Sequence, residues 1–235
     1  IVMGIILAAA VVLFSKLFCG YLCPLGTVQD LLMKLRKAIG FKGIDIKNGS
    51  VADKALRILK YALLFWIFYM TATASELFCK NLDPYYAVAT GFKGEITLWM
   101  SIISVAVVLI LGFLVNMFWC KYLCPLGAIS NSLKFWVWIV VLFAAYYLLG
   151  VLGLNVPWWV LLAAFCVAGY LLEILCGKPK FQVLHIMKND TKCTHCGLCT
   201  KACPYSIDVA GWKNGAVNAV DCTLCGERTA VCPDD

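Results

Sequence analysis

Cysteine is the residue type in this chain with the greatest capacity for chemistry. The sequence of 235 residues contains 14 cysteines, and most of them occur in short runs with regular spacing. Cysteines in such numbers either form disulfides in an oxidising compartment or bind metal as thiolates. The spacing within each run decides between these two chemistries, because thiolates that meet on one metal centre come from nearby positions of one loop.

The run that begins at Cys193 has the spacing C-x2-C-x2-C-x3-C-P, which is the pattern of bacterial ferredoxins. Cysteines at every third residue bring three thiolates to one cubane, and Gly197 lets the loop fold closely around the sulfurs. In this pattern the fourth cysteine, which precedes a proline, binds the other cluster. A zinc site would need four ligands in total and no such ending. The run therefore predicts an iron–sulfur site.

A second run in the same frame begins at Cys222, but Arg228 stands where its third cysteine is expected. The first predicted cluster is still complete, with the ligands Cys193, Cys196, Cys199 and Cys232. The second has only Cys203, Cys222 and Cys225. Three thiolates can hold a three-iron cluster, or a cubane whose fourth iron takes water or another ligand, but a protonated arginine cannot be that ligand. An error in the sequence at position 228 is the alternative interpretation.

A shorter motif, C-x3-C-P, occurs twice at an offset of 101 residues, and segments 18–26 and 119–127 agree at seven of nine positions. This repeat indicates that the helical part of the chain is embedded in a membrane and has two related halves. The axis that relates them would run along the membrane normal. Its cysteines are interpreted as ligands of one or two further clusters, as a redox-active dithiol or disulfide, or as buried structural residues. The repetition favours clusters. The candidate ligands are Cys19, Cys23, Cys120, Cys124 and, as an additional one, Cys176.

The second cysteine of each short motif directly precedes a proline, Pro24 or Pro125. The i, i+4 spacing places both thiols of a pair on one face if a helix continues through the motif. Proline is also typical of a first helical turn, so that each pair would instead straddle a helix start. Free amides at a helix start favour an anionic thiolate-ligated cluster.

The elements that must position these cysteines are apolar helices. The chain is 63% hydrophobic and 14% charged, whereas soluble domains have about 45–50% apolar and about 25% charged residues. A membrane span needs about 20 apolar residues, and five segments meet or nearly meet this length: 1–18, 55–78, 95–119, 133–152 and 157–175. Because Ile1 already lies inside an apolar run, we expect the natural protein to begin further upstream.

Lysine and arginine are concentrated between the first two predicted spans, which indicates that this loop is cytoplasmic. The net charge of +7 therefore suggests membrane orientation and no nucleic-acid partner. Counting crossings places segment 120–133 and everything after Cys176 on the same side. Segment 24–39 has the pattern of a short amphipathic helix, either on the cytoplasmic membrane face or simply packed on the protein surface.

The expected fold class is a polytopic α-helical membrane protein with an internal parallel repeat and a small C-terminal α+β domain. The helical membrane domain covers residues 1–176, with the repeat in 1–128 and an extra hairpin in 133–175. The composition becomes polar from Gly177, and residues 177–235 are expected to form a cytoplasmic two-cluster ferredoxin domain.

Isolated candidates outside the runs are interpreted as structural. Cys79 is expected to be a lone thiol and Cys166 a packing residue. Glu173, near the end of the last span, is expected to snorkel or cap a helix, although acids within a membrane can relay protons. His185 is expected to lie at an interface between the two domains, and His195 to be solvated within the cluster loop.

The four cysteine motifs, at 19–24, 120–125, 193–204 and 222–233, together resemble the membrane-bound 4Fe-4S polyferredoxins. These include the NapH-type quinol-dehydrogenase subunit of periplasmic nitrate reductase and, more distantly, the membrane domain of the nitrous-oxide-reductase accessory flavoprotein. The resemblance covers nearly the whole chain, and the chain departs from it at Arg228 and at the hairpin.

The resemblance implies a multi-pass protein of the cell (inner, cytoplasmic) membrane that carries [4Fe-4S] clusters. We expect it to be an electron-transfer subunit of an oxidoreductase complex, and no stand-alone enzyme. It would relay electrons between a membrane-side donor or acceptor, with quinone as a candidate, and a partner oxidoreductase. The alternative is a membrane reductase that acts in metalloenzyme maturation or in redox sensing.

Overall fold

The computed structural model describes residues 16, 23–46, 48–74, 84–91, 98–177, 186–189, 191–209, 211–212, 215–217 and 219–233. Three of the candidates, Cys19, Cys79 and His185, lie outside these residues, as does the first predicted span except for Lys16.

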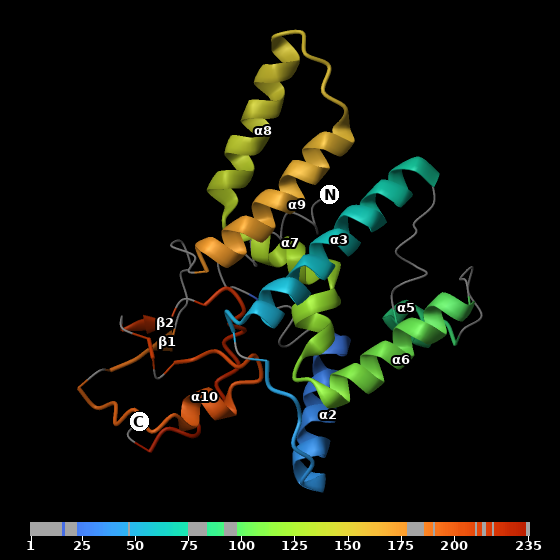
Figure 1. Ribbon diagram of the computed structural model, residues 1–235. Helices are drawn as coiled ribbons and strands as arrows, with labels where there is room; N and C mark the ends of the chain where they lie inside the picture. The colour runs from blue at the N-terminus through green and yellow to red at the C-terminus, as the bar shows by residue number, and fades with distance from the viewer. Residues whose placement is uncertain are drawn as a thin grey trace.

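Helices dominate the described part of the chain (Figure 1). Their bounds are α2 Pro24–Ile39, α3 Val51–Ala74, α5 Pro84–Ala89, α6 Leu98–Leu114, the π-helical turn η2 Trp119–Leu123, α7 Pro125–Leu133, α8 Trp136–Val151, α9 Trp158–Leu175 and α10 Leu198–Ala202. The strands β1 (Ile186–Met187) and β2 (Ala216–Val217) pair antiparallel. In the described C-terminal region, β1, β2 and α10 are therefore the regular elements.

Two described helices, α3 and α9, are long and apolar enough to cross a membrane. Helices α7 and α8 meet the same criterion only as a pair, with a bend of 92° at their junction. Within the predicted span 133–152, helix α8 covers Trp136–Val151. Lys134 is 5% exposed and its ammonium donates a hydrogen bond to the Val220 carbonyl of the C-terminal region, so the chain turns before it rises as α8.

The helix within the predicted span 95–119 ends earlier than expected, because α6 ends at Leu114. Its last carbonyl groups, which have no partner within the helix, accept hydrogen bonds from α2 and the segment that follows it. The Arg36 guanidinium donates to the Phe113 oxygen at 2.9 Å, and the Ile44 amide donates to the Leu114 oxygen at 2.9 Å. Helix α2 covers the predicted range 24–39, and Arg36 joins it to the end of α6.

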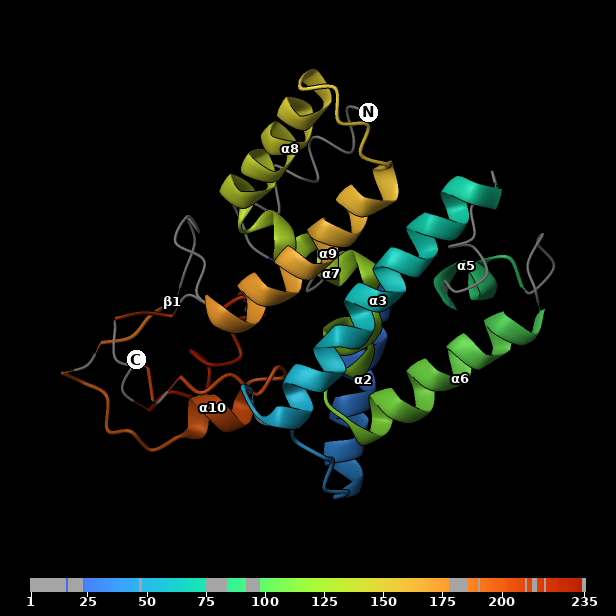
Figure 2. The same ribbon diagram turned by 45° about the horizontal axis from the view of Figure 1, so that its top comes forward.

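The hairpin of α8 and α9 stands beside α3 in both ribbon views (Figures 1 and 2). A glycine permits the close approach of α9 to α3 and α7: a Cβ at position 169 would lie 2.6 Å from the Ser132 hydroxyl and 2.9 Å from a ring carbon of Tyr61. Cys166 is buried beside Tyr61, Leu64 and Ala128, as expected of a packing residue.

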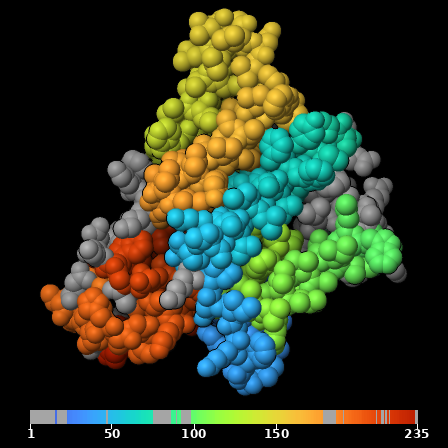
Figure 3. All heavy atoms as spheres, in the orientation of Figure 1, coloured from blue at the N-terminus to red at the C-terminus, as the bar shows by residue number. Residues whose placement is uncertain are grey.

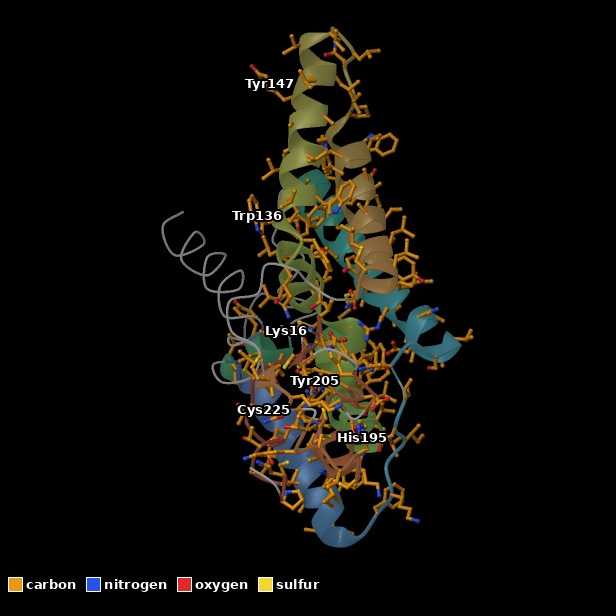
Figure 4. All side chains as sticks on the ribbon, turned by 90° about the vertical axis from the view of Figure 1, so that its left-hand side faces the viewer. Lys16, Trp136, Tyr147, His195, Tyr205 and Cys225 are labelled. Atoms are coloured by element: carbon orange, nitrogen blue, oxygen red, sulfur yellow. The ribbon has the colours of Figure 1, made fainter. Side chains whose placement is uncertain are left out.

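The C-terminal region packs directly against the helical part (Figure 3). Met117, just before η2, shares one buried core with Tyr205, Ile207 and Ala219 of the C-terminal region. Figure 4 shows Lys16 and Tyr205 at this junction, and the Lys16 ammonium lies 5.9 Å from the Tyr205 ring centroid. The two parts therefore share a packed interface.

Candidate metal centres

The four cysteines predicted to bind the first cluster line a single cavity of about 170 Å³. They are Cys193, Cys196, Cys199 and Cys232. The loop that carries the first three curls tightly, because His195 (φ 54°) and Gly197 (φ 74°) are both in the left-handed region. Gly197 also precedes α10, and its carbonyl accepts the Lys201 amide at 3.2 Å. The positive φ of Gly197 is a conformation that glycine adopts readily.

These four thiols fit a cluster better than a single ion. Each iron of a cubane takes its own thiolate, so cluster ligands surround a volume, whereas zinc ligands converge on one point. Across the described residues, no group of three or more His, Cys, Asp or Glu side chains converges closely enough to hold one ion. When bound, an iron–sulfur cluster would supply one-electron redox chemistry at this site.

The second cysteine set also comes together in part. Cys203 and Cys222 are buried in the same core as Met117, and half-buried Cys225 lies three residues beyond Cys222. This loop repeats the backbone conformation of the first loop. Leu224 (φ 55°) and Gly226 (φ 77°) occupy the places of His195 and Gly197.

Arg228 is directed at this second set. Its Nη2 donates a hydrogen bond to the Cys203 sulfur at 2.8 Å, and the residue is 5% exposed. Its Nη1 is buried and has no hydrogen-bond partner among the described residues. The residue that replaces the expected third cysteine therefore faces the cysteine of the preceding run.

The two C-x3-C-P motifs both start a helix. Cys23 (φ −74°, ψ 115°) and Cys124 (φ −65°, ψ 116°) are extended residues at the N-caps of α2 and α7, each followed by proline in the first turn. Of the two predicted geometries, the helix start is the one that the structure has. Cys120 lies in η2, and the Cys124 amide donates to the Trp119 carbonyl at 2.8 Å.

The motifs also lie close to one another in space. Leu25, two residues after Cys23, packs on the buried cluster formed by Val108, Trp119 and Cys120, to which Cys124 also belongs. Leu25 at the start of α2 therefore shares one hydrophobic cluster with residues of α6 and η2. Cys176 is not brought to this place: it is exposed at the end of α9 and lines a different cavity. The expectation that it adds to this set is not supported, because the packing of α9 carries its end toward Asp221.

A buried ionic network lies between the membrane-edge motif and the second cysteine set. Its centre is Arg57 of α3, which is 6% exposed. The Arg57 guanidinium pairs with Asp53 at 2.9 Å, with Asp221 at 2.6 Å, and also with Glu173. Asp221 directly precedes Cys222, so Arg57 joins α3 and α9 to the C-terminal region.

Each carboxylate of the network also pairs with one lysine. Lys121 pairs with Asp53 at 2.8 Å, Lys60 with Glu173 at 2.6 Å, and Lys16 with Asp221 at 2.8 Å. Buried ions are tolerated only when they are paired and hydrogen-bonded in this way. Because Lys121 lies between Cys120 and Cys124, the network connects that motif to the residue before Cys222.

The expectation that Glu173 snorkels or caps a helix is wrong. Glu173 is 5% exposed and also accepts a hydrogen bond from the Tyr61 hydroxyl at 2.8 Å. A signal was available in the sequence, because Asp53, Arg57, Lys60 and Tyr61 recur at helical spacing on one face of α3. A polar stripe on an apolar helix predicts an acidic or basic partner from another helix.

The same network sets the ionisation of Asp221. Burial by itself would raise the pKa of this carboxyl, but the positive charges of Arg57, Lys16 and Lys60 outweigh burial and hold that pKa well below its usual range. Asp221 is therefore an anion within the interface at neutral pH.

Comparison with known proteins identifies sequences that share the cysteine motifs. Two families, each described as a 4Fe-4S binding domain, match the chain, one over residues 1–42 and 97–137 and the other over residues 184–205. The first covers both C-x3-C-P motifs, and the second covers the run that begins at Cys193. No solved structure matches the chain.

Several curated relatives are similar over half of the chain or more. The putative electron transport protein YccM of Escherichia coli is 29% identical over 94% of this chain and 50% of its own length. The ferredoxin-type protein NapH of Haemophilus influenzae is 30% identical over 52% of this chain and 41% of its own. The regulatory protein NosR of Pseudomonas aeruginosa is 27% identical over 52% of this chain and 17% of its own. The chain thus spans half or less of the length of these three relatives.

Proposed function

We propose that this protein is a NapH-type membrane-bound 4Fe-4S ferredoxin protein and that it relays electrons between cysteine sites at the membrane edge and those of its C-terminal region. Iron–sulfur electron transfer is the role that the relatives named electron transport protein and ferredoxin-type protein support.

The observation that carries this proposal is the shared core at the junction. Met117, three residues before Cys120, packs with Cys203 and Cys222. Lys121, one residue after Cys120, is joined through Asp53 and Arg57 to Asp221. Packing and ion pairs together hold the two cysteine sites at one fixed spacing, which an electron relay requires.

The proposed ligands follow the cysteine sets. Cys193, Cys196, Cys199 and Cys232 bind the first cluster, and Cys203, Cys222 and Cys225 bind the second. Cys19, Cys23, Cys120 and Cys124 bind one or two further clusters at the membrane edge. The helix starts after Cys23 and Cys124 support the last assignment, because their free amides favour an anionic group.

The proposed setting is the inner (cytoplasmic) membrane, with the C-terminal region in the cytoplasm. Lys34, Lys37, Lys42 and Lys54 are exposed and support this orientation. Arg36, Arg57 and Lys60 are buried and do not contribute to it. The proposed partners are a quinone or another membrane-side donor or acceptor, and an oxidoreductase subunit.

A second candidate function is maturation or sensing for a metalloenzyme. The similarity to NosR, which is titled a regulatory protein, favours it. An electron relay co-purifies with a catalytic partner in fixed stoichiometry. Loss of a maturation factor instead leaves its target enzyme present but deficient in metal.

The proposal is tested by the iron and acid-labile sulfide content per chain, together with paramagnetic resonance of the reduced protein. The C-terminal sites alone account for at most about eight irons, so clusters at the membrane edge require a clearly higher count. The double variant Cys120→Ser/Cys124→Ser should lower the count and leave the C-terminal signals in place. An iron content that is unchanged in this variant would exclude these ligands.

A further inference from the structure

We infer that Arg228 closes the fourth corner of the second cysteine site to iron, so that this site takes a three-iron cluster instead of a cubane. This inference rests on the proposed function, since it concerns which cluster the second set of thiolates holds. Neither the spacing of the cysteines nor the family match decides between a three-iron cluster and a cubane with a non-protein ligand.

The backbone around Arg228 is that of an intact cluster loop. In the first run the residues on either side of the second cysteine, Cys196, have φ 54° and 74°, and in the second run the residues on either side of Cys225 have φ 55° and 77°. Non-glycine residues seldom adopt positive φ, so the agreement at Leu224 reflects the same loop shape. Position 228 therefore occupies the place that Cys199 has in the first run.

The side chain at this position points inward. Arg228 is 5% exposed, and its Nη2 lies 2.8 Å from the Cys203 sulfur. In the described part of the chain it forms no ion pair with a carboxylate, and its Nη1 is buried without a partner. A buried guanidinium normally has an anionic partner. Arg228 also lines the cavity of the first cysteine set, but its hydrogen bond is to Cys203, so the thiolates of the second set, together with the sulfides of a cluster, would supply that negative charge.

The chemistry of guanidinium then determines the occupant. Guanidinium has no lone pair with which to bind iron, and its positive charge repels a ferrous ion from the corner that it covers. Its donors instead fit the sulfur atoms of a cluster that lacks iron at that corner. Hydrogen bonds to cluster sulfurs also tune the reduction potential, so the charge of Arg228 favours the reduced form of this cluster.

The test compares three variants of the full chain in detergent: Arg228→Cys, Arg228→Gln and Glu227→Cys. Arg228→Cys supplies the missing thiolate. Arg228→Gln removes the charge without adding a thiolate. Glu227→Cys adds a thiol at the neighbouring exposed position and is the matched control, because the Glu227 side chain is 50% exposed. Each protein is measured as purified, after reduction, and again after treatment with excess ferrous ion and a reductant followed by desalting and mild reoxidation, so that any remaining three-iron cluster returns to its paramagnetic oxidised form.

The wild type and Glu227→Cys should show the paramagnetic signal of an oxidised three-iron cluster, and they should keep it after ferrous treatment. Arg228→Cys should lose this signal and gain about one iron per chain. Arg228→Gln should show the signal as purified but lose it on ferrous treatment, because without the guanidinium charge a ferrous ion can bind at the vacant corner of the cluster.

Two results would overturn the inference. One is a wild type with cubane signals only, and the other is equal uptake of ferrous ion by the wild type and Arg228→Gln. Failure of the proposed function looks different, because the reduced cubane signal of the site at Cys193, Cys196, Cys199 and Cys232 would then be missing from every variant.

Discussion

Neutralising Glu173 in the buried network should destabilise the protein far more than neutralising an exposed carboxylate. In Glu173→Gln, Lys60 loses its carboxylate partner at 2.6 Å, and no other ion pair of Lys60 is formed among the described residues. The Lys60 side chain is 1% exposed, so its ammonium cannot be hydrated without local opening.

Breaking a buried ion pair by removing one partner costs about 3–5 kcal/mol. Arg57 still has Asp53 and Asp221 in the variant, so we place the loss near the lower end, at about 3 kcal/mol, which is roughly a hundredfold change in the unfolding equilibrium. The control is Asp30→Asn. In the Lys34–Asp30 pair at 2.9 Å, the Lys34 side chain is 56% exposed and the Asp30 side chain 33% exposed, and pairs near the surface contribute about 0–1 kcal/mol.

The double variant Glu173→Gln/Lys60→Met separates an unpaired charge from a general packing defect. Removing the stranded ammonium should recover about 2 kcal/mol of the loss, since a buried pair replaced by neutral side chains is often close to neutral overall. The free energy of unfolding in detergent is followed by denaturant titration, with tryptophan fluorescence as the signal. A Glu173→Gln variant as stable as Asp30→Asn, or a double variant less stable than Glu173→Gln, would refute the reasoning.

Two further predictions concern the junction and the membrane-edge site. Arg57→Met removes the ion pair to Asp221 at 2.6 Å. The loss of about 1.4 kcal/mol or more should make amide hydrogen exchange of residues 219–225 at least roughly tenfold faster. Unchanged exchange would contradict the role of Arg57 in joining the C-terminal region to α3. Gly127→Ala would place a Cβ 2.9 Å from the Cys120 carbonyl oxygen, so it should displace η2 and lower the iron content of the membrane-edge site. The control is Gly150→Ala, whose Cβ would meet nothing within 4 Å and which should leave the iron content unchanged.

Local features of the cysteine motifs could be predicted from the sequence because they depend on neighbours in the chain. The spacing of the run at Cys193 and the glycine inside it specify a tightly curled loop, and the structure has that loop. Pro24 and Pro125 indicated a possible helix start after each short motif, and both α2 and α7 begin there. In each of these cases the backbone preference of one residue type is sufficient.

Span boundaries were less predictable, because polar contacts from distant segments end the helices. The apolar composition of 95–119 gives no sign that α6 ends at Leu114, where Arg36 supplies donors from α2. Lys134 likewise lies at the bend between α7 and α8, where its ammonium bonds to a carbonyl of the C-terminal region. Hydropathy measures the transfer of a segment into lipid and contains no term for such partners.

By itself the sequence determined which residues are candidate iron ligands, since cysteine spacing is a local property. Only the tertiary structure decided what lies between the cysteine sites. Glu173 is 116 residues from Arg57, and Asp221 is 205 residues from Lys16, so their pairing depends on how α9 and the C-terminal region pack on α3. The direction of the Arg228 side chain toward Cys203 also required the fold, because a charged residue in a broken motif reads equally well as a surface residue until its burial is known.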